Sequence, residues 1–540
     1  MSNYVGLSRW VKQTPLWENW FSPWGNNLGT RYRRGYGFWF YHVGWVYLTV
    51  GVATTVGVWW IPPGVVYLPV GAALVYLVVF APGLLGGWGH PRGGYRGAPG
   101  VVALWLTLVT ALTVGVAAAT TVVWSTRVAG PGWVLDEVST PFVLLTVGLA
   151  PVVVLASLDS VRGNQYWYYG LLLGLLGLLV PVFCVTHFLV FYVLFEVLGF
   201  PMFLLVGVYG PRTQRVDAAY KFFIYTFVGS AAVLPVLVYL YTRVGTTEVG
   251  HLLRYQFTDL EQTLFFGLAA LPFGVKIPVM PVHLWLPEAH VEAPTPVSMV
   301  LAALLLKTGG YAFVRFLVPV WPWGAYVWGP TATTVGVLSV LWGSVYALVQ
   351  VDTKRMIAYA SVAHMSLVFV GLLSGPAATA GGVYLMLAHG WIAAGLFAGI
   401  GVMYDRYHTR TIRYLGGLAG VMPVFGVLFF VCTLGNFSFP GTAGFTGEFL
   451  LLLGIAQHNT AVALAGGSTV LVSLAYSVWL YNRVFYGVIP PTVGVHQDLT
   501  PVELGVLGWC TTGVVLLGWV GGYWGVYANY DEVVYTVVLG

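Results

Sequence analysis

The chain has 540 residues, of which 58% are hydrophobic and 8% are charged. Ordinary soluble domains carry about 25% charged residues, so this composition excludes a soluble globular protein. The formal net charge of +5 comes mostly from short basic loops, at residues 210–221, 351–355 and 404–413. Such loops are typical of membrane topology signals or phospholipid contacts, and we expect no nucleic-acid partner.

Residues 1–41 form a basic, Trp-rich arm, and apolar runs of about 20 residues then recur along the chain. The runs that we expect to span the membrane are 43–61, 65–86, 101–124, 141–158, 168–186, 187–209, 219–242, 262–281, 295–320, 331–350, 356–374, 379–403, 421–457, 461–481 and 502–528. Because these runs are continuously apolar rather than alternating, they favour helices over a transmembrane β-barrel. The sequence therefore predicts an all-α polytopic membrane protein with about 14–15 transmembrane helices.

The segment around Lys276 carries prolines that should break its helix. Pro278 and Pro281 lie directly behind the lysine. Proline lacks an N–H, so each one should free the carbonyl four residues earlier, here those of residues 274 and 277. Irregular backbone is tolerated at membrane depth only where protein or water satisfies it, so we expect a small hydrated cavity beside each titratable group, Lys276 included.

A second break is expected in the run 421–457, which is too long for one crossing and contains the motif SFPGTAG. Paired interruptions in two halves of a chain indicate inverted repeats with an ion path near the membrane midplane. We place the two inverted five-helix repeats near residues 166–320 and 331–481.

Six ionisable side chains lie inside apolar runs, where a charge costs about 2.5–3.5 kcal/mol on insertion scales. They are Glu196, Lys276, Lys307, His364, His389 and Glu448. Such residues are candidates for proton transfer, with partners that face the protein interior. Burial and a nearby carboxylate act in opposite directions on the proton affinity of a lysine. Moving a glutamate towards or away from Lys276 would therefore load or unload its proton.

Structural roles are the alternative for each of these side chains. A buried lysine or glutamate can belong to a structural ion pair, and a lysine can extend to the interface. A hydrogen-bonded core histidine is the alternative for His364 and His389, and it is the preferred interpretation for His283 and His290, near the break. We expect Arg315 to extend its side chain towards the membrane surface.

Nothing in the sequence predicts a bound cofactor or metal. The three cysteines, Cys184, Cys432 and Cys510, each stand alone in an apolar run, without the spacing of a zinc or iron–sulfur site. No G-x-G-x-x-G follows a strand pattern, so a Rossmann nucleotide site is not expected. Any associated redox chemistry should take place on other subunits.

Five stretches carry a specific resemblance. They are YVLFEVLGFPMFLLVGVYGPRTQRVDAAYKFFIYTFVGS, FGVKIPVMPVHLWLPEAHVEAPTPVSMVLAALLLKTGGYAFVRF, VDTKRMIAYASVAHMSLVFVGLL, LAHGWIAAGLFAGIGVMYDRYHTR and FPGTAGFTGEFLLLLG. In this order they resemble the chain 4 family of NADH–ubiquinone oxidoreductase, respiratory complex I. The related chains 2 and 5 and the Mrp cation/proton antiporters share the fold, but Tyr-Asp-Arg at 404–406 with His408, and the glutamate at position 448, favour chain 4.

The resemblance implies the antiporter-like fold and a role in proton transfer for all six side chains. Glu196 would pair with Lys276 in the first half-channel, and Lys307 would relay protons between the half-channels. The two histidines would lie along the axis of the path, and Glu448 would be the terminal proton carrier.

The resemblance also implies a division of the chain. Residues 133–485 would form the proton-translocation core. Residues 42–132 would hold N-terminal transmembrane helices, one of them extra relative to the family. Residues 486–540 would form a loop and the last transmembrane helix.

The family implies an enzyme complex in which this chain binds no cofactor. FMN, iron–sulfur clusters and ubiquinone would belong to other subunits, whose NADH:ubiquinone electron transfer drives proton pumping. The expected partners are other membrane subunits, especially the neighbouring antiporter-like chains 2 and 5, and phospholipid such as cardiolipin. A composition rich in Gly (69), Trp (23), Tyr (33) and Phe (30) favours an organellar gene, hence the mitochondrial inner membrane rather than a bacterial one.

Two other functions compete with this hypothesis. An Mrp-type Na⁺(K⁺)/H⁺ antiporter subunit would share the motifs. A scaffold that has lost transport is disfavoured by the four charged residues Glu196, Lys276, Lys307 and Glu448, because a scaffold would gain stability from apolar replacements.

Overall fold

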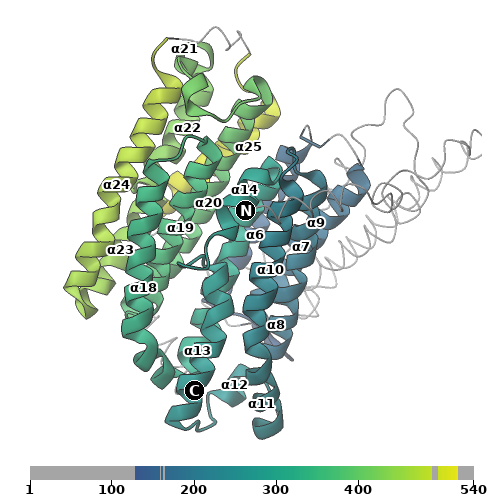
Figure 1. Ribbon diagram of the computed structural model, residues 1–540, viewed down its shortest axis with the longest axis vertical. Helices are drawn as coiled ribbons and strands as arrows, with labels where there is room; N and C mark the ends of the chain where they lie inside the picture. The colour runs from purple at the N-terminus through teal and green to yellow at the C-terminus, as the bar shows by residue number, and fades with distance from the viewer. Residues whose placement is uncertain (1–127, 159, 162–163, 489–496, 521–540) are drawn as a thin grey trace, which may run out of the picture.

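The computed structural model describes residues 128–158, 160–161, 164–488 and 497–520. These residues form a bundle of helices with one small antiparallel β-hairpin, in which β1 (Val128–Gly130) pairs with β2 (Trp133–Leu135) (Figure 1). The basic arm and the predicted spans 43–61, 65–86 and 101–124 lie outside the described residues.

The helices follow one another along the chain with short connections. In the first half they are α6 (Thr140–Ser157), α7 (Gln165–Val182), α8 (Phe188–Val197), α9 (Gly199–Tyr209), α10 (Arg215–Ser230), α11 (Leu234–Val244), α12 (Val249–Leu252), α13 (Asp259–Lys276), α14 (Trp285–Glu292), α15 (Thr295–Val300), α16 (Leu306–Ala312) and α17 (Val318–Val320). In the second half they are α18 (Pro322–Leu348), α19 (Thr353–Leu372), α20 (Pro376–Tyr407), α21 (Leu418–Val421), α22 (Pro423–Asn436), α23 (Ala443–His458), α24 (Thr460–Phe485) and α25 (Pro501–Val520). Short 3₁₀ turns are η1 (Ala231–Val233) and η4 (Ile412–Tyr414), and π-helical turns are η2 (Leu301–Leu305) and η3 (Phe313–Leu317).

Within the described residues, ten helical stretches are long and apolar enough to cross a membrane. The predicted all-α polytopic fold is therefore confirmed. One boundary was wrong by a wide margin: α18 begins at Pro322, nine residues before the predicted start of the run 331–350. Proline is well suited to the first turn of a helix, where its missing N–H leaves no bond unmade.

Polar side chains fix where several helices begin. Thr258 and Glu261 form a reciprocal capping box at the start of α13, with Thr258 N donating to Glu261 Oε2 at 2.8 Å. Asp352 accepts from the amide of Lys354 at 2.8 Å and so caps α19. Asn459 caps α24 in the same way. These caps satisfy amides that a helix cannot bond internally.

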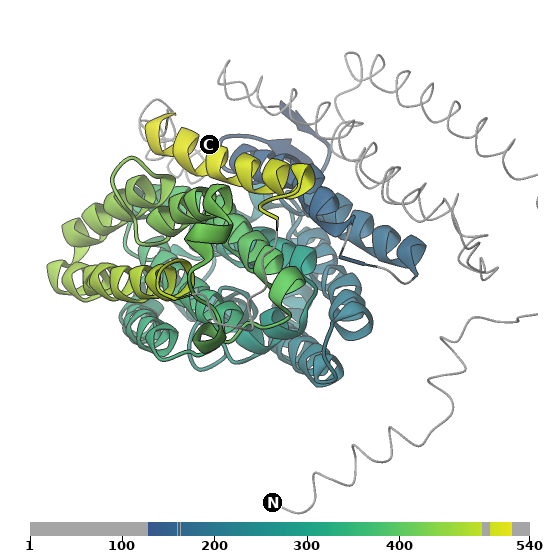
Figure 2. The same ribbon diagram turned by 90° about the horizontal axis from the view of Figure 1, so that it is seen from above.

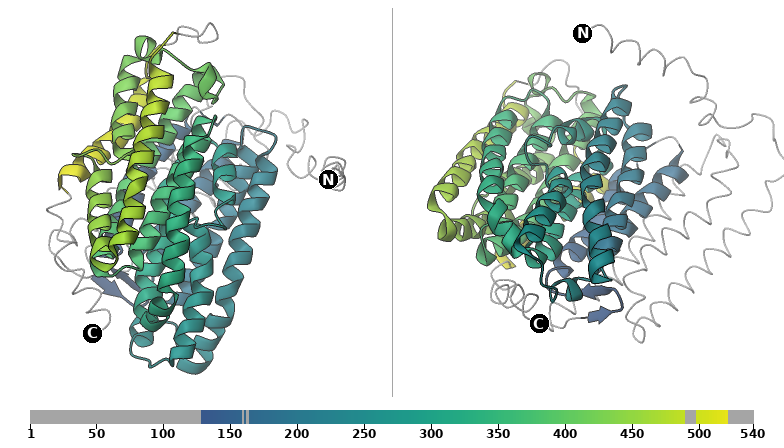
Figure 3. Two further views of the ribbon diagram at one scale, coloured as in Figure 1. Left: turned by 60° about the vertical axis from the view of Figure 1, so that its left-hand side comes forward. Right: turned by 60° about the horizontal axis from the view of Figure 1, so that its bottom comes forward.

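Ion pairs identify the two ends of the bundle. Arg212, after α9, lies 3.6 Å from Asp352, which follows α18, so both helices end at the upper end in Figure 1. Arg315, in η3, lies 2.7 Å from Asp136, ahead of α6, and this pair marks the opposite end. The helices run side by side along the long axis (Figure 3). Helices α7 and α18, the first of each predicted repeat, therefore run in opposite directions, as inverted repeats require.

Arg315 corrects one sequence prediction. Its side chain was expected to extend to the membrane surface, but the residue is only 5% exposed and pairs with Asp136. Arg315 donates to Asp136 Oδ2 through Nη1 alone, and a buried charge needs such a partner. The loop that carries Asp136 supplies it from a distant part of the chain.

Both predicted helix breaks are present. Helix α13 ends at Lys276 and α14 begins at Trp285, while α22 ends at Asn436 and α23 begins at Ala443. The second break needs a glycine, because Gly441 adopts a φ of +90°, a conformation that other residues adopt only with strain.

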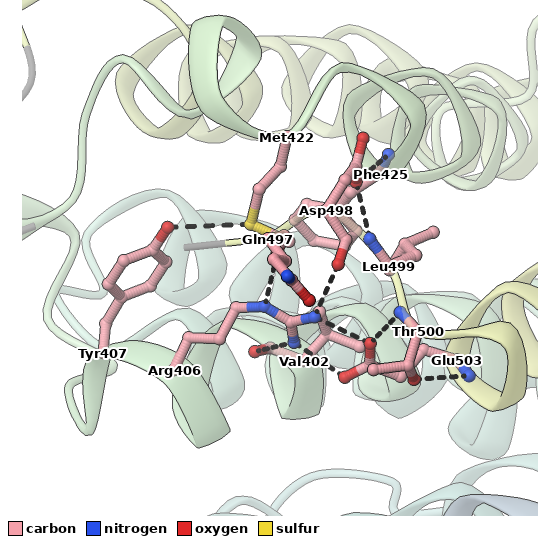
Figure 4. Close-up of polar contacts among 10 residues, drawn as sticks. All are labelled: Val402, Arg406, Tyr407, Met422, Phe425, Gln497, Asp498, Leu499, Thr500 and Glu503. Carbon is pink, nitrogen blue, oxygen red and sulfur yellow. Dashed lines mark hydrogen bonds and ion pairs between the residues drawn. The ribbon is translucent and has the colours of Figure 1, made fainter. Parts of the chain in front are cut away.

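The last described helix, α25, crosses the outside of the bundle when seen from above (Figure 2) and packs on α6, α20, α22 and α23. Its start is fixed by Arg406, which donates two hydrogen bonds of 2.7 Å to the carboxylate of Glu503 (Figure 4). Asp498 accepts from Phe425 N at 3.2 Å (Figure 4) and thereby ties the same loop to the start of α22.

Candidate functional site

Lys276 is the last residue of α13 and is 2% exposed. Its Nζ has no hydrogen-bond partner among the described residues. The Nζ lies 5.1 Å from the ring centroids of both Phe195 and Phe222. The negative end of the helix dipole also lies at this C-terminus and favours a cation there. The break thus places one ammonium in an apolar interior without a direct counter-ion.

Glu196 lies at the end of α8 and is partly exposed at the surface of the bundle. It interacts with the hydroxyl of Ser230 on α10 and acts electrostatically on Lys276. The two charged groups do not form an ion pair of the kind that links Arg315 to Asp136. The structure therefore brings the predicted pair together as neighbours that are not in contact.

The backbone of the first break differs from the sequence prediction. The carbonyl of residue 274 was expected to be free, but it accepts from Val279 N at 3.0 Å. The next carbonyl, that of Val275, accepts from the indole N–H of Trp285 at 3.0 Å. The amide of Met280 donates to Ser339 Oγ on α18 at 2.8 Å. Donors beyond the helix end thus replace the bonds that proline removes.

Lys307 lies at the centre of a segment that is buried throughout. Its Nζ donates to the carbonyl of Ala302, in the π-helical turn η2, at 2.7 Å, and lies 2.8 Å from Nδ1 of His389. A π-helical turn widens the helix, and such turns are frequent at functional sites. Gly309 permits the close approach of α13, because a Cβ there would lie 2.8 Å from the Phe273 carbonyl.

The line of titratable groups continues through α19 to the second break. The ring of His364 lies 5.9 Å from that of His389, centroid to centroid, and its Nε2 has no partner within the described part of the chain. Glu448, 2% exposed on α23, accepts a hydrogen bond from Ser438 in the break. Glu448 acts electrostatically on His364. Lys307, His389, His364 and Glu448 therefore form one buried series.

His290 belongs beside this series, although its sequence position favoured a structural role near an interface. The residue is fully buried, and neither ring nitrogen has a hydrogen-bond partner in the described structure. It stacks on Phe397 with a centroid distance of 4.6 Å. Lys307 and Lys354 act on it electrostatically. The sequence signal for a functional role of His290 was its place in the motif PEAH, directly after the break. The spacing of the motif did not indicate how deeply the side chain is buried.

A small cavity lies next to the second break, between α19, α20, α22 and α24. It has room for about one water molecule. Its polar wall comprises Thr433, Asn436, Tyr476 and Ser477. The Tyr476 hydroxyl is buried without a hydrogen-bond partner among the described atoms, and a buried hydroxyl of this kind is a natural place for a bridging water.

A cluster of charges lies at the upper end, where four connections meet. Arg212 lies 3.8 Å from Glu292 and 3.6 Å from Asp352, and Arg410 lies 3.8 Å from Asp352. Lys354 and Arg410 also donate to backbone carbonyls at the end of α14. This cluster fixes α14, the helix that follows the first break, and thereby the position of His290.

The chemistry available to the site is acid–base chemistry. No group of three His, Cys, Asp or Glu in the described ranges is arranged to hold a metal ion. The series of lysine, histidine and glutamate side chains instead offers alternating proton donors and acceptors inside an apolar bundle. Donor–acceptor distances of about 2.6–3.2 Å allow direct proton transfer, and the contact between Lys307 and His389 lies in that range.

Comparison with known proteins identifies the family of the chain. Residues 185–473 match the family model described as NADH:quinone oxidoreductase/Mrp antiporter, transmembrane. The chain is 40% identical over 386 residues to NADH-ubiquinone oxidoreductase chain 4 of Marchantia polymorpha, covering 71% of this chain and 78% of the relative. It is 40% identical over 399 residues to NADH-quinone oxidoreductase subunit M of Rhodobacter capsulatus, covering 71% and 78%.

A solved structure shares the fold over most of the chain. A chain in respiratory complex I from Thermus thermophilus with bound NADH superposes with a TM-score of 0.76 and 28% identity, covering 88% of this chain and 99% of that one. This chain therefore belongs to the NADH:quinone oxidoreductase/Mrp antiporter family, in the group formed by chain 4 and subunit M.

Proposed function

We propose that the chain is a proton-translocating membrane-arm subunit of respiratory complex I. It couples NADH:ubiquinone electron transfer on other subunits to proton movement through its buried Glu, Lys and His side chains. The observation that carries this proposal is the contact between Lys307 and His389, 2.8 Å apart in a fully buried part of the bundle. Two basic groups in such contact can exchange a proton without water between them.

The first step takes place at Glu196 and Lys276. A charge change in a neighbouring subunit acts on Glu196, which is partly exposed on the surface of the bundle. Because no ion pair fixes Lys276, a shift of the carboxylate towards it stabilises the ammonium, and a shift away releases the proton. Each shift of one pKa unit corresponds to about 1.4 kcal/mol, which a small change in distance can supply.

The second step carries the proton across the middle of the bundle. Lys307 receives the proton and shares it with His389. His364 links His389 to the second break, and Glu448 accepts the proton there with Ser438 as its hydrogen-bond donor. The two histidine rings are neighbours, with a centroid distance of 5.9 Å, and a water molecule between their nitrogens would complete the path.

The electron-transfer part of the reaction belongs to other subunits. FMN, iron–sulfur clusters and ubiquinone are bound there, and this chain contributes proton transfer to NADH:ubiquinone reductase. The cysteines of the described region, Cys184, Cys432 and Cys510, are free and buried, and no step of this path uses them.

The neighbouring antiporter-like chains 2 and 5 are the proposed partners within the membrane. The surface of α8, α9 and α10 around Glu196 is strongly apolar, with Val193 49%, Phe200 58% and Val228 65% exposed. A partner on this surface would lie within reach of the Glu196 carboxylate. This arrangement supports passage of an electrostatic signal between chains.

The charge distribution supports an orientation. Basic side chains gather at the upper end of the described bundle. They are Arg212, Arg215, Lys354, Arg355, Arg406, Arg410, Arg413 and Arg483. At the opposite end Arg243 and Arg254 stand among acidic residues, and Arg315 is neutralised by its ion pair with Asp136. By the positive-inside rule the upper end faces the mitochondrial matrix, in the inner membrane, where it also meets the phosphates of lipids such as cardiolipin.

An Mrp-type cation/proton antiporter is the second candidate, because the family model includes both classes. Purification of the native assembly separates them. A co-purifying arm with flavin and iron–sulfur absorbance selects complex I, and an assembly of antiporter chains alone selects the alternative.

The central experiment replaces Lys276 by methionine in the assembled complex. Lys276→Met keeps the length of the side chain and removes its proton, so we expect proton pumping per electron pair to fall sharply. Lys221→Met is the matched control, because Lys221 is 53% exposed and forms a surface ion pair with Glu288 that contributes little to stability. Near-normal pumping by Lys276→Met would reject the proposal.

A further inference from the structure

The Lys276 ammonium has an unusual environment for a buried charge. A lysine at the end of a helix normally finds backbone carbonyls of the last turn. Here those carbonyls are already engaged: Phe273 O accepts from Ile277 N at 2.8 Å, Gly274 O accepts from Val279 N, and Val275 O accepts from the Trp285 indole. Among the described residues, no oxygen or nitrogen is left in hydrogen-bond contact with Nζ.

Two aromatic rings take the place of these oxygens. The Nζ lies 5.1 Å from the centroid of Phe195 on α8 and 5.1 Å from that of Phe222 on α10. Both distances lie within the range of about 6 Å at which a ring face attracts a cation, and the attraction is strongest when water is excluded. Both phenylalanines are buried, at 2% and 0% exposure.

Each ring is held in place by a further aromatic contact. Phe222 packs on Trp285 with a centroid distance of 5.3 Å, and the indole of the same tryptophan binds the Val275 carbonyl. Phe195 packs edge-on against Phe273, also at 5.3 Å. Helix α14, through Trp285, and the last turns of α13, through Phe273, thus both support the rings around the lysine.

We propose that Phe195 and Phe222 form an aromatic site that binds the protonated Lys276 side chain and competes with Glu196 for it. The two phenylalanines are positioning residues: they hold the ammonium away from the carboxylate until a signal arrives. This inference rests on the proposed function of Lys276 as a proton carrier, and it adds a binding partner for the charged form.

The competition follows from the order of residues on α8. Phe195 and Glu196 are adjacent, so a rotation of α8 that brings the carboxylate towards Lys276 also moves the Phe195 ring. The ammonium therefore exchanges the Phe195 ring for the carboxylate in a single movement, while Phe222 on α10 remains beside it. A charge without any partner is strongly disfavoured in this interior, so the rings lower the barrier to the exchange.

The first test compares three substitutions of the same size. Phe195→Leu and Phe222→Leu each remove a ring that faces Nζ. Phe191→Leu is the matched control, because Phe191 lies one turn earlier on α8, is fully buried and contacts the ring of Phe195, at 5.9 Å, but not the lysine. We expect assembly of the complex to be equal in all three, and pumping per electron pair to fall about tenfold only in the first two.

The second test changes the electronics of the ring without changing its shape. Incorporation of ring-fluorinated phenylalanine at position 195 weakens cation binding progressively with each fluorine, while packing is preserved. We expect pumping to fall in the same progression, and at position 191 to stay level. This measurement tests whether the Phe195 ring binds the ammonium even if a leucine variant fails to assemble.

The outcomes separate this inference from the proposed function. Equal effects of all three leucine variants, or pumping that is insensitive to fluorination, would overturn the aromatic site. If Lys276→Met has already abolished pumping, the role of the lysine stands and only the aromatic site is rejected. Normal pumping by Lys276→Met would reject both.

Discussion

Lys307 Nζ lies 2.8 Å from His389 Nδ1, with no exposed surface on the lysine. Two positive charges at this distance would repel by about 6 kcal/mol at an effective dielectric constant of about 20. The pair therefore holds one proton between its two nitrogens, and a second proton can arrive only when the first leaves. The carbonyl of Ala302 orients the lysine by accepting a hydrogen bond at 2.7 Å.

Lys307→Arg tests whether the proton on this lysine must move. Arginine keeps the positive charge but does not release its proton in proteins. We expect the complex to assemble and its proton pumping through this chain to fall by about 100-fold, the usual size of a lost proton-transfer group. The measurement is proton release per electron pair in vesicles. Wild-type pumping by Lys307→Arg would mean that the charge alone matters.

Glu448→Gln tests the end of the series. Glutamine preserves the shape and the acceptor for the Ser438 hydroxyl but cannot take up a proton, so we expect pumping to be lost. Ser438→Ala removes a hydrogen bond to a charged group, which is worth about 1.5–3 kcal/mol. It should slow pumping without abolishing it. If Ser438→Ala were as damaging as Glu448→Gln, the serine rather than the carboxylate would limit the step.

Asp136→Asn tests the ion pair that closes the lower end of the bundle. Removing one partner leaves the Arg315 charge buried and unpaired, which costs about 3–5 kcal/mol. We expect the variant to unfold at a lower temperature than the wild type at neutral pH, with pumping per electron pair unchanged in the complexes that remain. An unchanged unfolding temperature would show that the pair contributes nothing to stability.

The same pair predicts the pH dependence of stability. Burial alone would raise the pKa of Asp136, but the ion pair with Arg315 and the hydrogen bonds from Ser139 outweigh it and hold the pKa below its usual value. The stability from this group is therefore fully present above the unfolded pKa of about 3.9. It is lost as the pH falls through the lower folded value. Thermal unfolding of the wild type should thus approach that of Asp136→Asn only in strong acid.

The helices and their breaks could be predicted from the sequence because they depend on local chemistry. Apolar runs of membrane length identified the helices, and Pro278 behind Lys276 identified the end of α13. The early start of α18 was missed because the aromatic and glycine residues after Pro322 lower the apparent hydrophobicity there.

The contacts of the site depend on residues far apart in the chain and could not be read from local patterns. The partner of Arg315 is Asp136, and the sequence gives no signal that links them. The burial of His290 follows from the position of the whole of α14. The aromatic neighbours of Lys276 come from two different helices, α8 and α10, whose relative rotation is set by packing.

Gly518→Ala tests whether α25 holds the second break in position. A Cβ at Gly518 would lie 2.4 Å from the carbonyl of Gly441, in the break, and 2.7 Å from Thr442 C. Thr446 Oγ1 also donates to the Gly518 carbonyl at 3.3 Å, two residues before Glu448. We expect Gly518→Ala to push α25 away, to lower stability by about 1–3 kcal/mol and to reduce pumping.

Gly508→Ala is the matched control on the same helix, because nothing lies within 4 Å of a Cβ there and alanine normally stabilises a helix by up to about 1 kcal/mol relative to glycine. The unfolding temperature should therefore fall for Gly518→Ala and stay level or rise for Gly508→Ala, and proton release should fall only for Gly518→Ala. Equal behaviour of the two variants would show that the end of α25 does not support the break.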